Sequence, residues 1–159
     1  MGLKEKTSGN ERFFPEENNS QQENLSQLPR ILLIDNDSFI RTLLAFQIEK
    51  RSGQEVVVND VGSINEAFVM LELSMRRKSG SKQSSPFYGH IIISIFDGDY
   101  GLDEYERFLK FAQKLSIPVT LFLLDSDEDL INLAVKYKAR VVYKGGIDIP
   151  TLAQFQINF

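Results

Sequence analysis

The sequence predicts one α/β domain, in which a doubly wound parallel sheet of five strands carries helices on both faces. Three observations predict this fold class. Short, almost wholly apolar runs recur along the chain, as expected of strands that are buried on both faces. Stretches with apolar residues at helical spacing separate the runs, and this alternation favours parallel strands joined by right-handed crossovers. The 159 residues are enough for one such domain and a tail.

The predicted strands are the apolar runs at 31–34, 56–58, 90–96, 118–124 and 141–143. Helices are predicted over 39–50, from 64 to about 75, over 103–115, after a capping Ser126 and, as a short last helix, from Asp148 and Pro150. A polar loop is expected over 77–86.

Local signals set several of these boundaries. Gly53 follows the first helical pattern and is expected to end it. Asn59-Asp60 is expected to end the second strand, because both residue types favour turns. Ser63 and Glu66 have the spacing of a capping box, which predicts the start of the second helix.

The first 29 residues differ from the rest of the chain. They hold only six apolar residues among many Glu, Asn, Gln, Ser and Lys residues. A stretch that buries so little apolar surface does not offset the entropy of ordering, so we expect a disordered tail over 1–29 and a folded domain over 30–159. Within the tail, Phe13-Phe14-Pro15 fits a docking peptide, although a loosely collapsed aromatic pair is the simpler interpretation.

Composition excludes several classes of function. The net charge of -4 argues against nucleic acid as the main partner, because such binding needs clustered Lys and Arg. The chain has no cysteine and one histidine, so disulfides, thiolate zinc sites and histidine-based catalytic triads are not expected. No apolar run approaches the ~18 residues of a membrane span, and no signal peptide is apparent. We therefore expect a cytoplasmic protein with no membrane partner.

Acidic residues and one lysine follow the predicted strands. Asp35-Asn36-Asp37 follows the first strand, Asp97 the third, and Lys144 the fifth. Ligand sites of doubly wound sheets lie at these carboxyl ends. Carboxylates there suit a hydrated Mg²⁺, and the lysine suits phosphoryl oxygens. A single Asp in such a place more simply caps a helix or forms a turn.

The order of these residues resembles the response-regulator receiver (CheY-like) family over about 30–159. Residues 31–41 (ILLIDNDSFIR) resemble its first strand, acidic pair and first helix. Residues 103–106 (DEYE) resemble the opening of its third helix, and 117–119 (IPV) the entry to its fourth strand. Tyr143-Lys144 followed by Asp148 resembles its fifth strand, lysine and last helix. The resemblance implies a flavodoxin-like fold, a phosphoacceptor, a metal site and a non-enzymatic role in two-component signalling.

Several signature residues differ from the family. The second residue of the acidic pair is Asn36, so the implied Mg²⁺ site (Asp35, Asn36 and Asp97, with Asp37 as a substitute ligand) should be weak. No other cofactor is implied. The switch hydroxyl at the end of the fourth strand is replaced by Leu123 or Leu124, and the moving aromatic by Val141.

Two alignments compete for the phosphoacceptor. An alignment from Tyr88-Gly89 places Ser94 at this position, and serine cannot form an acyl phosphate. An alignment from the helix start at Asp103 places it near residue 96, and Asp97 then fits with one deletion. We favour Asp97, because it is the first polar residue after the apolar run, with Lys144 binding the phosphoryl oxygens.

The favoured function is a stand-alone, degenerate receiver that acts by protein–protein interaction, largely independently of phosphorylation. Its partner would be a histidine kinase or a downstream regulator, and a homodimer through the last helices is an alternative. A conventional receiver phosphorylated on Asp97 is the second hypothesis.

A third hypothesis is a phosphatase similar to the haloacid dehalogenases, with Asp35 as nucleophile and Asp37 as general acid. The early helix start and the short chain after Lys144 argue against it. His90 opens a buried strand, so we expect a packed or hydrogen-bonded histidine there rather than a ligand.

Overall fold

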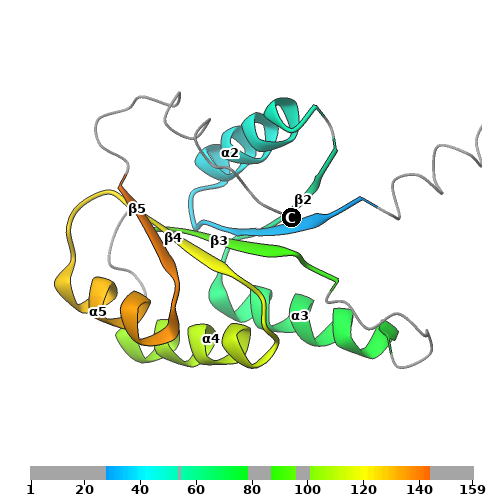
Figure 1. Ribbon diagram of the computed structural model, residues 1–159. Helices are drawn as coiled ribbons and strands as arrows, with labels where there is room; N and C mark the ends of the chain where they lie inside the picture. Colours follow the sequence, from blue (N-terminus) through cyan, green and yellow to red (C-terminus); the bar gives the residue numbers. More distant parts are fainter. Residues whose placement is uncertain (1–27, 54, 79–86, 96–100, 144–159) are drawn as a thin grey trace, which may run out of the picture.

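The computed structural model describes residues 28–53, 55–78, 87–95 and 101–143, and these form the predicted α/β domain (Figure 1). The strands are β1 (Arg30–Ile34), β2 (Val57–Val61), β3 (His90–Ile95), β4 (Val119–Leu123) and β5 (Arg140–Tyr143). The helices between them are α2 (Ser38–Arg51), α3 (Ile64–Lys78), α4 (Leu102–Lys114) and α5 (Glu128–Tyr137). Residues 1–27 of the predicted tail, the loop from residue 79 and the short last helix predicted from Asp148 lie outside the described residues.

The five strands form one parallel sheet in the order β2-β1-β3-β4-β5. This is the flavodoxin-like order of a receiver fold, with the reversal of strand order between β1 and β3. Helix α2 covers one face, and α3, α4 and α5 cover the other (Figure 1). The prediction of a doubly wound sheet with helices on both faces is confirmed.

Side chains alternate between the two faces and form two core clusters. Leu32, Ile34, Ile91 and Ile93 lie on the face of α3, α4 and α5. This cluster also includes the buried side of α4, formed by Tyr105, Phe108, Leu109 and Ala112. On the α2 side, a smaller cluster joins β1, β3 and β4 to Leu44 of the helix.

Two local predictions are corrected. The second strand does not end at Asn59-Asp60 but continues to Val61, because each of its residues pairs with β1 as far as Ile34. The cap of α5 is Asp127 rather than Ser126, and its carboxylate accepts hydrogen bonds from two backbone amides of the first turn. Asp and Ser both favour this position, so the sequence alone did not separate the two neighbours.

The capping box at the start of α3 is present in a shifted form. Ser63 Oγ accepts from the Glu66 amide at 3.1 Å, as predicted. The Glu66 carboxylate, however, accepts from the amide of Gly62 at 2.9 Å, one residue before the cap. Among the described residues, no helix is long and apolar enough to cross a bilayer.

Candidate functional site at the carboxyl ends of the strands

Asp35 lies at the end of β1 and is fully buried. Its backbone amide donates to the Val61 carbonyl at 3.2 Å, so the chain still follows the sheet at this residue. Its Oδ1 accepts from the amide of Asp37 at 2.8 Å. This bond turns the chain toward α2 and fixes the carboxylate at the carboxyl edge of the sheet, as predicted.

Ser94 lies on the neighbouring strand, next to Asp35 in register. Ile34 of β1 pairs with Ile93 of β3, so the following residues of the two strands, Asp35 and Ser94, are at the same level. Alternation along each strand places both on the α2 side of the sheet, with Leu33 and Ile92. Ser94 is also buried, and it pairs in register with Phe122 of β4.

Arg41 stabilises the edge around Asp35, a role that the sequence alone did not indicate. Its Nη1 donates to the Asp35 carbonyl at 2.7 Å, and its Nε donates to Asp60 Oδ2 at 2.7 Å. The guanidinium therefore links α2, β1 and β2. Because the second strand was predicted to end at Asn59-Asp60, Asp60 was expected to be a turn residue, and its contact with Arg41 was not predicted.

Asn36 and Asp37 have different environments although they are adjacent. Asn36 is exposed. Asp37 is the N-cap of α2, and its Oδ1 accepts from the amides of Phe39 and Ile40 at 2.8 and 3.1 Å. This is the capping role that a single Asp at a strand end was expected to have. A metal ion at Asp37 would compete with the cap for the same carboxylate.

The structure also describes the residues that the resemblance places at the switch positions. Leu123 ends β4, is buried, and pairs in register with Tyr143 of β5. Leu124 is 46% exposed, so the buried member of the two leucines is Leu123. Val141 is half-buried and packs against the larger core cluster. Asp97 and Lys144 lie outside the described residues.

His90 opens β3 and is hydrogen-bonded, as expected. Its Nε2 lies 2.9 Å from Thr120 Oγ1 on β4. Burial, together with the positive charge of Arg140, lowers the pKa of His90 from 6.5 to about 4. The imidazole is therefore neutral near pH 7, which suits a structural contact between two strands.

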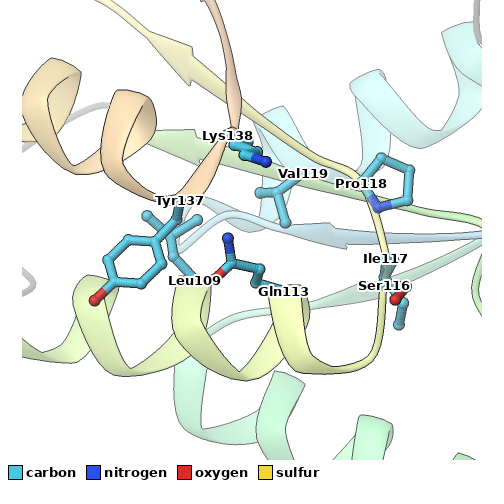
Figure 2. Close-up of a pocket in the computed structure, with 8 residues that line it drawn as sticks. All are labelled: Leu109, Gln113, Ser116, Ile117, Pro118, Val119, Tyr137 and Lys138. Carbon is cyan, nitrogen blue, oxygen red and sulfur yellow. The ribbon is translucent and has the colours of Figure 1, made fainter.

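A groove of about 230 Å³ lies at the opposite end of β4. Figure 2 shows it between α4, the turn that follows α4, and the end of α5. Leu109, Ile117 and Val119 line it together with Gln113 and Lys138. Because the turn before β4 forms part of its wall, the groove is separated from Asp35 and Ser94 by the length of the sheet.

The fold resembles solved receiver domains at low sequence identity. The receiver domain of the histidine kinase CKI1 from Arabidopsis thaliana, complexed with Mg²⁺ and BeF₃⁻, has 17% identity and a TM-score of 0.61, over 84% of this chain and 90% of that chain. A receiver domain protein from Methanospirillum hungatei JF-1 has 16% identity and a TM-score of 0.55, over 74% of this chain and 82% of that chain.

A response regulator receiver protein from Pseudomonas putida has 16% identity and a TM-score of 0.54, over 74% of this chain and 86% of that chain. No family model matches the sequence, and no curated protein matches it. These similarities establish the receiver fold of the chain.

Proposed function

We propose that this chain is a degenerate receiver-like signalling module that binds another signalling protein and acts largely independently of phosphorylation. The observation that carries the proposal is the pairing of β1 with β3. It places Ser94 beside the buried Asp35, where the resemblance to receivers requires the acceptor carboxylate. This geometry favours the alignment on Ser94 over the alignment on Asp97.

The chemistry of Ser94 argues against acceptance of a phosphoryl group from an acyl-phosphate or phosphohistidine donor at this position. A receiver accepts the group on a carboxylate, whose oxygen attacks phosphorus while the bond to the donor breaks. The Ser94 hydroxyl is a much weaker nucleophile at neutral pH unless a neighbouring base removes its proton. It also contributes no negative charge to a metal site.

The residues present would hold Mg²⁺ weakly. Oxygen ligands suit this ion, and Asp35 and Asn36 supply them at the end of β1. One charge is lost because Asn36 is neutral, and Asp37 is already engaged as the cap of α2. When bound, Mg²⁺ would neutralise phosphoryl oxygens, and Lys144 is the residue that the resemblance assigns to the same oxygens.

Leu123 and Val141 support independence from phosphorylation. A hydroxyl at the end of β4 follows the phosphoryl group in the receivers that this chain resembles, and Leu123 has none. A ligand shifts a conformational equilibrium only through different contacts with the two states. Without the hydroxyl and the moving aromatic, a phosphoryl group would change the conformation of α5 and β5 little.

The face built from α5 and the ends of β4 and β5 is the proposed contact with a histidine kinase or a downstream regulator. Val135 is 73% exposed there, and Tyr143 is 46% exposed. Helix α5 is held on α4, because Glu106 Oε1 accepts hydrogen bonds from both Lys136 Nζ and Tyr137 Oη. The exposed apolar side chains are thus presented by a helix that is already fixed in place.

The acceptor assignment can be tested with acetyl phosphate and Mg²⁺, followed by intact mass measurement. The unaltered chain should gain no phosphoryl group. The double variant Asn36→Asp, Ser94→Asp restores both carboxylates and should gain one, with acetate released. If the unaltered chain were phosphorylated and Asp97→Ala abolished it, the conventional receiver would replace the proposal.

Independence from phosphorylation can be tested once a partner is in hand. Asp97→Ala should then leave the binding free energy within about 1 kcal/mol, the range of a change away from the contact. Val135→Ser on the proposed face should weaken binding by more than Val69→Ser, which changes an exposed valine on α3. A large loss of affinity with Asp97→Ala would show that the acceptor controls the contact.

A further inference from the structure

Helix α2 carries an apolar stripe on its outer surface. Phe39 is 73% exposed and Phe46 57% exposed, and the two are seven residues apart, so they lie on one side of the helix. The half-buried Leu43 lies between them, and the Lys50 ammonium lies 5.8 Å from the centre of the Phe46 ring. We call Phe39, Leu43, Phe46 and Lys50 the α2 stripe.

The α2 stripe is not needed to hold the helix on the sheet. The inner side of α2 packs the helix on the sheet, because Leu44 is buried in the smaller core cluster and Ile40, Ala45 and Ile48 pack against this cluster. Two exposed phenylalanines on one side of a helix indicate a binding surface. Packing another apolar group on the rings removes them from water, which is favourable in free energy.

We propose that the N-terminal segment of the same chain covers this stripe, with Phe13 and Phe14 packing against Phe46 and Phe39. The segment enters the fold beside the end of α2. Val57 donates its amide to the Pro29 carbonyl at 2.9 Å, and the next amide, of Val58, donates to Glu49 Oε1 of α2 at 3.0 Å. The last turns of α2 therefore lie close to the point where the N-terminal segment joins β1.

The length of the segment fits the stripe. Phe14 lies fourteen positions before Leu28, and the chain between them spans up to roughly 45 Å when extended. Helix α2 has 14 residues and is only about 21 Å long. Phe13 and Phe14 can therefore reach either end of the stripe without any movement of the sheet.

The charges of the N-terminal segment are complementary to those of the last turn of α2. Between Phe14 and Leu28 the segment has three glutamates, Glu16, Glu17 and Glu23, and no Lys or Arg. The last turn of α2 has Lys50 and Arg51, both exposed. A segment that runs from β1 along α2 passes this basic turn with its glutamates first, and then brings Phe14 and Phe13 to the two phenylalanines.

A spin label on the full chain tests the proposal directly. The chain has no cysteine, so Asn18→Cys provides a single attachment site for a nitroxide four residues after Phe14. We expect the amide signals of residues 39–50 to lose intensity, and those of α3 to keep theirs. Phe13→Ser with Phe14→Ser, or Phe46→Ser alone, should restore the α2 signals. Val69→Ser is the matched control and should leave the loss unchanged.

Mixing two differently labelled samples of the chain distinguishes a contact within one chain from a contact between two copies. In the mixture, one chain carries the nitroxide but no ¹⁵N, and the other carries ¹⁵N but no nitroxide. If the contact is within one chain, the α2 signals of the ¹⁵N chain should keep their intensity. A loss in this mixture would overturn the proposal and identify a second copy as the occupant. Full α2 intensity in the labelled single chain would overturn it as well.

Discussion

At the scale of single residues, three consecutive side chains have three different roles. Asp35 is buried at the sheet edge, Asn36 is exposed, and Asp37 caps α2. The sequence predicted that carboxylates would gather here, because the carboxyl ends of parallel strands share one edge. It did not predict their separate roles, since these depend on which backbone amides each oxygen accepts from.

Adding one negative charge at residue 36 should raise the affinity of this edge for Mg²⁺. Asn36→Asp should strengthen Mg²⁺ binding by roughly tenfold, because one more carboxylate near the ion contributes one to two kcal/mol in water. Titration calorimetry measures the change. Asn132→Asp adds the same charge on α5 and is the control. Equal affinity of Asn36→Asp and the unaltered chain would mean that another group already fills the role.

His90 should make stability depend on pH. Its pKa is about 4 in the fold and 6.5 when unperturbed, so the unfolded chain takes up the proton first as pH falls. The free energy of unfolding should therefore decrease between about pH 6.5 and pH 4, by roughly 3 kcal/mol in all. Urea unfolding of the unaltered chain and of His90→Gln measures the difference. The same pH dependence in both would contradict the assignment.

At the scale of elements, the boundaries depend on which polar side chain reaches a free amide. Helix α2 was predicted over 39–50 and begins at Ser38, with Asp37 as its cap. The cap of α5 is Asp127, one residue after the predicted Ser126. The second strand was predicted too short, because pairing with β1 outweighs the turn preference of Asn59 and Asp60. Local preference is weak beside hydrogen bonds to a neighbouring strand.

Two substitutions at Asp37 separate its capping role from its charge. Asp37→Ala should lower the free energy of unfolding by about 1 kcal/mol, because the amides of Phe39 and Ile40 lose their acceptor. Asp37→Asn keeps an acceptor oxygen and should cost much less. Thermal or urea unfolding gives both values. If both variants lost the same stability, the charge rather than the cap would be responsible.

At the scale of the whole molecule, the fold class and most elements could be predicted from the sequence. Runs such as 31–34 and 90–96 are too apolar for surface segments and too short for helices, so burial in a central sheet is the economical interpretation. The residue opposite Asp35 could not be predicted in this way. The run around β3 is mostly apolar, and such a run does not specify its register against β1.

The central claim is that this receiver fold does not transmit a phosphoryl signal to the face of α5 and β5. The ¹H–¹⁵N spectrum of the full chain, recorded with and without Mg²⁺ and beryllofluoride, tests it most directly. The double variant Asn36→Asp, Ser94→Asp is measured in parallel, because it should bind the phosphoryl mimic while Leu123 and Val141 are retained. We predict unchanged amide signals for residues 128–143 in the unaltered chain, and changes confined to the strand ends in the variant. Shifts across α5 and β5 of the unaltered chain would contradict the account and establish a conventional switch.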